Sequence, residues 1–406
     1  MRQVLAVIIG FSFIPILTKK KVRIAYSILI SAAAMMLISG LGPDAIIQIF
    51  RSTMLDPKRI GQYLTVLEIG ALGSLLKKYD FIDIIIDRLN KVVGSKKLQM
   101  MLIPALIGLL VVPGGAIISA PFIDRIGDEL DIGKPRRAVI NLIYRHISMH
   151  IMPYSNSLLL MALLLPDVSV YKVIGFNIIF IIIYIIIGYF IYIRDVEDDR
   201  PRTREGSVLR DFVQLLLYTS PIYFAVILNI AFKTPFYLGI LANILILYLL
   251  KPEKTIIKDF IKGVEINVFL TIFGVYLIQA TISKFPEFNR MLESLLSNSG
   301  TLIPAMIGIS AFFGLATGFQ AASLGVIIPV INAMALSIGR TTALAHIAFT
   351  WSFIGYFFSP IHLCQLFTIG HMGIDTGSLY KEYSKFIVFL TMAVIAENLI
   401  LLAIIK

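Results

Sequence analysis

Two apolar stretches of the chain carry a proline close to polar side chains that could bind an ion. In the first stretch, Ser155, Asn156 and Ser157 follow one residue after Pro153. Proline breaks a helix because it has no N–H to donate, and buried polar side chains need partners. The pattern therefore predicts a broken helix whose N-terminus faces an anion and whose free carbonyls face a cation, although a plain proline kink fits it too. The second stretch surrounds Pro360 and contributes Ser359, His362 and Gln365.

Two further apolar stretches are broken by small residues, and each predicts the tip of a re-entrant hairpin. Proline and glycine interrupt the first at 113–115, and glycine interrupts the second at 318. Irregular backbone at membrane depth is tolerated only inside protein or along a water-filled cavity. The alternative is that these small residues permit close helix packing. The predicted substrate-binding residues of the two tips are Pro113, Gly114, Gly115 and Ala116, and Thr317, Gly318 and Gln320.

Ionisable residues within apolar stretches form a third group of candidates, because charges inside a membrane are costly. Arg145 could attract an anion with its guanidinium fork, or it could extend to water from a helix end. Glu68 could carry a coupling proton, or it could pair with a neighbouring basic residue. Three histidines could relay protons or simply bond to buried carbonyls, namely His146, His150 and His346.

The single cysteine, Cys364, excludes an intrachain disulfide and any metal cluster built from cysteines. His146 and His150 are one helical turn apart, but no carboxylate beside them supports a zinc site. We therefore predict no metal site and no bound cofactor. No glycine-rich loop precedes a Lys-Ser or Lys-Thr pair, so ATP-driven pumping by this chain is not predicted.

The candidate residues occupy corresponding places in two halves of the chain. The segment LIPALIG at 102–108 returns as LIPAMIG at 302–308, and His146 returns as His346 at the same offset. A likeness at a fixed offset indicates a duplicated fold. In an apolar chain it indicates a secondary transporter, whose binding site lies where the two repeats meet.

The composition is that of a membrane protein, with 58% apolar and 15% charged residues. Soluble domains are nearer half apolar and a quarter charged. The basic residues behind the net charge of +11 are scattered through short loops, which indicates membrane topology and argues against a nucleic-acid partner. The ten predicted membrane-spanning segments are 4–17, 24–41, 60–76, 139–165, 168–193, 210–232, 235–250, 266–283, 341–369 and 385–404.

The distribution of loop charge predicts the orientation of these segments. If both hairpins enter and leave on one side, each half crosses the bilayer five times, and the second half is inverted. The positive-inside rule then places both termini outside the cytoplasm, in the inner (plasma) membrane. The predicted halves are 1–194 and 210–406, joined by a charged cytoplasmic linker at 195–209.

Paired re-entrant hairpins, each followed by a proline-broken helix in an inverted repeat of five spans, resemble the ion transporter superfamily. That group includes divalent-anion/sodium symporters, citrate transporters and gluconate permeases. Within it, PGGAIISAP at 113–121 and ATGFQAASLG at 316–325 are most similar to an uncharacterised prokaryotic membrane family, domain of unknown function 401. The resemblance implies an all-α fold, an elevator mechanism and a homodimer. The symporters carry Ser-Asn-Thr at each hairpin tip and this chain does not, so sodium coupling and dicarboxylate specificity do not carry over.

The expected function is cation-coupled transport of a small organic anion of the carboxylate type. An intramembrane hydrolase and a passive anion channel are the alternatives. The coupling ion is either H+, carried by Glu68 or the histidines, or Na+, bound by oxygen ligands. Oxygen-rich breaks occur in both halves, which favours sodium slightly. The predicted sodium ligands are Ser155, Asn156, Thr317 and Ser359, with Glu68 as the titrating candidate.

Overall fold

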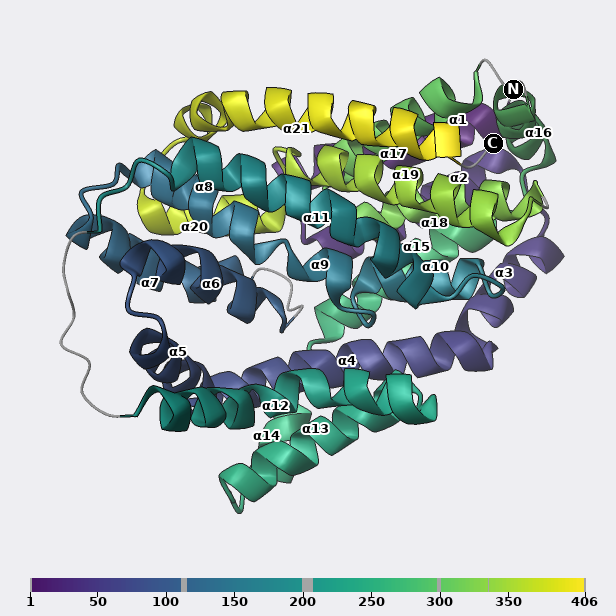
Figure 1. Cartoon of the computed structure of the whole chain (residues 1–406). Helices are drawn as coiled ribbons and strands as arrows, with labels where there is room; N and C mark the ends of the chain where they lie inside the picture. Colours follow the sequence, from purple (N-terminus) through teal and green to yellow (C-terminus); the bar gives the residue numbers. More distant parts are fainter. Residues whose placement is uncertain (1, 111–114, 199–206, 298–300, 335, 405–406) are drawn as a thin grey trace.

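The computed structural model describes residues 2–110, 115–198, 207–297, 301–334 and 336–404, and every regular element in these ranges is an α-helix (Figure 1). The all-α prediction is therefore confirmed. Two predicted tip residues, Pro113 and Gly114, lie outside the described residues, as does most of the predicted linker at 195–209.

In the first half of the chain, two amphipathic helices flank the long helix α4, and a helix pair and a broken helix follow. The bounds are α1 (Arg2–Lys19), α2 (Ile24–Ser39), α3 (Pro43–Leu55), α4 (Pro57–Lys78), α5 (Phe81–Val92), α6 (Lys96–Gly108), α7 (Ala116–Glu129), α8 (Lys134–Arg145), α9 (Ser148–Ile151), α10 (Asn156–Leu164) and α11 (Val170–Tyr192).

The second half contains helices of similar length and character. Their bounds are α12 (Val208–Phe232), α13 (Phe236–Leu250), α14 (Ile256–Gly263), α15 (Ile266–Ile282), α16 (Pro286–Ser297), α17 (Leu302–Thr317), α18 (Gln320–Ala333), α19 (Ile338–Phe357), α20 (Leu363–Met372) and α21 (Thr376–Ile404). The repeated segments 102–108 and 302–308 lie in α6 and α17, each the first helix of a helix pair.

Several helices are long and apolar enough to cross a membrane. Within the described ranges there are four, namely Lys134–Leu164, Val170–Tyr192, Val208–Phe232 and Thr376–Ile404, or five if the bent pair α14–α15 is one span. All ten predicted segments are helical, but the others are shorter or more polar. The molecule is thus compatible with a polytopic membrane protein, and the ten passes stay a prediction.

The helices break where the sequence predicts interruption. Pro153 lies between α9 and α10, and Pro360 lies between α19 and α20. Helix α17 ends at Gly318, whose φ of 59° places it in the left-handed region. A Cβ there would also lie 2.7 Å from a side-chain atom of Ile361, so glycine suits both the backbone conformation and the close packing.

Aromatic side chains hold the second broken helix in place. Phe353 and Phe357 of α19 stack with ring centroids 5.3 Å apart, and Tyr184 of α11 lies edge-on to both. Phe386 of α21 completes the group, 5.2 Å from Tyr184. Edge-on ring pairs contribute about 0.5–1.5 kcal/mol each beyond the area they bury. This packing fixes α19 against α11 and α21.

Several polar contacts gather at one end of the molecule. Arg88 pairs with Asp211 at 2.9 Å, and Lys78 pairs with Asp259 at 2.6 Å. Arg136 also hydrogen-bonds to Asp195 there, which lowers the pKa of that carboxyl. At the other end, near α3 and α16, lie both termini (Figure 1).

Candidate functional site

One cavity of about 260 Å³ lies among the helix breaks of both halves. It extends to Glu265 and Asn267, which are exposed where α15 begins. Of the predicted site residues, the cavity is lined by Arg145, His146, Ser155, Asn156, Ser157, Gly318, Gln320 and His362.

Three helices begin at the cavity wall. Their N-caps are Ser155 for α10, Phe319 for α18 and His362 for α20, and none of these side chains caps its own helix. The first N–H groups of a helix have no partner within the helix, and the helix dipole places partial positive charge there. Helix N-termini from both halves therefore present donors to the same space.

A hydrogen bond joins the first break to the second hairpin. Ser157 donates to Oε1 of Gln320 at 2.8 Å, and Nε2 of Gln320 donates to the carbonyl of Phe349 at 3.0 Å. Ser157 is the second residue of α10 and Gln320 is the first residue of α18, so this bond holds two of the three N-termini together.

Arg145 is the one arginine on the cavity wall among the described residues, and it is 5% exposed. Its guanidinium packs against Gly115, where a Cβ would lie 2.3 Å from Nη2. Its backbone packs against Gly108, where a Cβ would lie 2.2 Å from the carbonyl oxygen. The two described residues of the first predicted tip, Gly115 and Ala116, are buried and do not line the cavity.

Two histidines from the two broken helices meet in the cavity wall. Nε2 of His146 lies 3.2 Å from Nε2 of His362. The Sγ of Cys364 lies within 4.8 Å of a ring nitrogen of each histidine, and all three residues are buried. In the sequence, His146 pairs with His150 only by helical spacing, and Cys364 stands alone as the single cysteine. The repeat indicates that the two halves meet, but no local pattern indicates that these three side chains converge.

Three predicted ligands bond to nearby backbone instead of lining the cavity. Thr317 donates to the carbonyl of Phe313 at 2.7 Å, as a hydroxyl at a helix end often does. Ser359 donates to the carbonyl of Leu315 at 2.7 Å. Gln365 donates to the carbonyl of Phe357 at 2.5 Å. These side chains stabilise the breaks, and the cavity does not include them.

Three predicted ionisable residues also lie away from the cavity. Glu68 is buried in α4, and in the described part of the chain no ion pair joins it to a basic residue. His150 is enclosed by aromatic rings, with Phe353 at 4.4 Å and Phe180 at 4.6 Å between centroids. His346 lies 3.2 Å from Oε1 of Glu397, a contact that pairs two buried residues.

Several cavity residues were not predicted from the sequence. Tyr356 lies four residues before Pro360 of the second predicted break, and its hydroxyl lies 3.4 Å from Nε2 of His146. Asn267 and Thr271 are polar positions early in the apolar helix α15. Polar residues at the start of a predicted span are the only available signal, and such residues are common at membrane interfaces.

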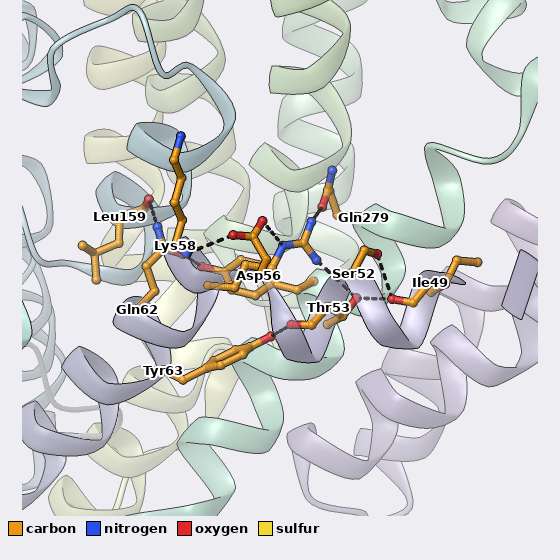
Figure 2. A network of polar contacts seen from close by, with 11 residues as sticks. Ile49, Ser52, Thr53, Asp56, Lys58, Gln62, Tyr63, Leu159 and Gln279 are labelled. Carbon is orange, nitrogen blue, oxygen red and sulfur yellow. Dashed lines mark hydrogen bonds and ion pairs between the residues drawn. The ribbon is translucent and has the colours of Figure 1, made fainter. Parts of the chain in front are cut away.

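A buried arginine network connects α4 to its neighbours (Figure 2). Arg59 donates to Gln279 of α15 at 2.8 Å and to Thr53 of α3 at 3.2 Å. One turn further along α4, Gln62 donates to the carbonyl of Leu159 in α10 at 2.8 Å. Gln62 also accepts a hydrogen bond from Tyr276 of α15. The network thus links α4 both to α15 and to the helix that begins at the cavity.

Comparison with known protein families gives one match. Residues 2–405 match the model of the family described as "Protein of unknown function (DUF401)". No curated protein matches the chain.

Proposed function

The chain belongs to the DUF401 family over nearly its whole length, and we propose that it is a secondary transporter that moves a small organic anion by alternating access. The observation that carries the proposal is the cavity, where three uncapped helix N-termini and Arg145 line one space. Helix N-termini and a guanidinium both favour carboxylate groups. A volume of about 260 Å³ suits a ligand of a few heavy atoms.

The inverted repeat is part of this proposal, and the order of the helices supports it. Each half has two apolar helices, an amphipathic helix, a long helix and a second amphipathic helix, followed by a helix pair, a broken helix and a final long helix. The cavity then lies where the halves meet, as in transporters built from such repeats. In an elevator-type movement, α10 moves against α4, and the bond from Gln62 to Leu159 must break.

The proposed orientation agrees with the polar contacts between loops. Segments assigned to the cytoplasm contact one another, as Lys251 does with Asp80. Segments assigned to the outside do likewise, as Lys284 does with Gln48. With this orientation, the exposed Glu265 places the cavity mouth on the cytoplasmic side.

Cysteine labelling tests the orientation. On a Cys364→Ser background, a membrane-impermeant maleimide should label Asp167→Cys in intact spheroplasts. Lys254→Cys should react only after permeabilisation, and both positions are exposed in the structure. Labelling of Lys254→Cys in sealed spheroplasts would refute the proposed orientation.

We propose cation coupling because an anion enters against the usual membrane potential. Of the predicted sodium ligands, Ser155 and Asn156 line the cavity, while the His146–His362 pair offers a titrating alternative. Uptake by proteoliposomes at clamped pH and zero potential decides between them. A sodium gradient alone drives uptake if sodium is coupled, and a proton gradient alone drives it otherwise.

Anion binding is tested on purified protein with a panel of mono-, di- and tricarboxylates. A ligand at a hundred times its Kd should raise the unfolding free energy by about 2.7 kcal/mol. Arg145→Gln should weaken binding at least tenfold, about 1.4 kcal/mol, while Arg340→Gln should not. Arg340 is the matched control because it is exposed in the first turn of α19. Equal stabilisation of wild type and Arg145→Gln would refute the assignment.

The competing function is an intramembrane hydrolase, and one observation favours it. Cys364 lies within 4.8 Å of two histidine nitrogens, which is the composition of a nucleophile with a general base. A hydrolase would consume its ligand, whereas a transporter returns it unchanged. Recovery of the bound carboxylates intact after prolonged incubation with the protein supports transport over hydrolysis.

A further inference from the structure

The His146–His362–Cys364 cluster has an arrangement of donors and acceptors that fixes the histidine tautomers. Nδ1 of His146 lies 2.6 Å from the carbonyl of Leu142, and Nδ1 of His362 lies 3.2 Å from the carbonyl of Phe357. A carbonyl oxygen only accepts, so each Nδ1 must carry the hydrogen. In the neutral rings both Nε2 atoms then present lone pairs.

These two lone pairs face each other across 3.2 Å. Such an arrangement is repulsive unless a positive charge lies between the nitrogens, either a shared proton or a metal ion. The thiol of Cys364 favours the metal ion. A shared proton needs only the two nitrogens, whereas a metal ion needs further ligands, and the thiol supplies one within 4.8 Å.

The distances suit a tetrahedral metal ion. With Zn–N bonds of about 2.0–2.1 Å, two histidine nitrogens on one zinc ion lie about 3.3 Å apart. A thiolate on the same ion lies about 3.6 Å from each nitrogen. The Sγ of Cys364, which lies within 4.8 Å of the histidine nitrogens, would therefore move at most about 1 Å toward them. Rotation about its Cα–Cβ bond supplies a movement of that size.

The surroundings also match those of a metal site. Metal-binding histidines usually donate the other ring N–H to a carbonyl or carboxylate, and His146 and His362 both do so. Two imidazoles and a thiolate, with no carboxylate in the described cluster, favour zinc over magnesium or calcium. All three residues line the cavity, so the fourth coordination position opens into it.

We propose that His146, His362 and Cys364 form a binding site for one transition-metal ion, zinc first, with a fourth position available to water or to an anionic oxygen. The site joins the two broken helices, because His146 follows α8 and the other two residues begin α20. A bound ion would therefore restrain the two halves of the molecule at the cavity. The inference does not depend on transport, since metal binding is measured directly.

Cobalt substitution tests the site in full-length protein purified in detergent and stripped with a chelator. Because Cys364 is the only cysteine in the chain, any thiolate-to-cobalt charge-transfer band must come from it. We expect one Co2+ per chain, this band, and the visible spectrum of tetrahedral cobalt. Zn2+ should displace the cobalt stoichiometrically, as counted by mass spectrometry of the bound metal.

Variants then identify the ligands. His146→Gln, His362→Gln and Cys364→Ser should each weaken Co2+ binding more than tenfold, and Cys364→Ser should abolish the charge-transfer band. His371→Gln is the matched control, because His371 is exposed and outside the cluster. The wild-type spectrum alone remains decisive if a variant fails to fold. Absence of the band from wild-type protein at saturating Co2+, or binding unchanged in His362→Gln, would overturn the proposal.

Discussion

At the scale of single residues, the position of Arg145 depends on two glycines. Gly115 leaves room for its guanidinium, and Gly108 leaves room for its backbone carbonyl. The contact at Gly115 involves the end of a flexible side chain, which can adopt another rotamer. The contact at Gly108 involves a backbone carbonyl, which cannot. Glycine is thus needed at 108 for close packing of α6 against α8, whichever ligand the cavity binds.

The repeated segments offer a matched pair of substitutions. Gly108→Ala should lower the unfolding free energy by about 1–3 kcal/mol, because the new Cβ meets the carbonyl of Arg145 at 2.2 Å. Gly308→Ala, at the corresponding position of α17, should cause no loss because nothing lies within 4 Å of its Cβ. Thermal unfolding in detergent measures both variants. Equal melting temperatures for the two would contradict the packing described at Gly108.

The sequence predicted which residues lie at the breaks, but it could not predict which way their side chains bond. Ser157 reaches Gln320 across the cavity, while Thr317 and Ser359 bond to backbone carbonyls nearby. All three are small hydroxyl residues at interrupted helices. The local sequence does not predict the hydrogen-bond partner of each hydroxyl, because that partner depends on which acceptor the fold places nearby.

At the scale of elements, α4 is anchored through Arg59. Its guanidinium binds Gln279 and Thr53, and it lies 5.2 Å from the ring centroid of Tyr276. Figure 2 shows Gln279, Thr53 and Gln62 gathered around this part of α4. A buried guanidinium needs all these partners, since an unpaired buried charge is costly.

Removing that guanidinium should therefore loosen α4. Arg59→Ala leaves Gln279 and Thr53 without their donor, and we expect the unfolding free energy to fall by about 2–3 kcal/mol. Lys58→Ala is the control, because Lys58 is exposed and only its backbone N–H bonds to Asp56. Melting temperatures of both variants provide the measurement. An Arg59→Ala protein as stable as Lys58→Ala would show that the network contributes little.

The elements themselves were largely predictable. Apolar runs predicted the long helices, and Pro153 and Pro360 predicted the breaks. Helices α3 and α14 were missed. Both are short, and their mixed composition resembles loop sequence. Their helical state depends on packing, of α3 against α15 and α4, and of α14 against α4.

At the scale of the whole molecule, residues from the two halves of the sequence meet. His146 and His362 belong to different halves and meet at 3.2 Å, as do Ser157 and Gln320 at 2.8 Å. The repeat predicted that the halves meet at a site. It could not predict which side chains meet, because that depends on how the helices of the two halves pack along their whole interface.

Exchange of a labelled carboxylate across a membrane tests the transport proposal most directly. Proteoliposomes loaded with the best-binding carboxylate of the panel should accumulate its labelled form from outside by counterflow, with the ligand recovered intact. Gly115→Leu, which displaces the guanidinium of Arg145, should abolish this exchange, while Gly339→Leu should retain it, since a Cβ at Gly339 meets nothing within 4 Å. The predicted result is counterflow by the wild type and by Gly339→Leu, and no counterflow by Gly115→Leu. No exchange by correctly inserted wild-type protein, or full exchange by Gly115→Leu, would contradict transport through this cavity.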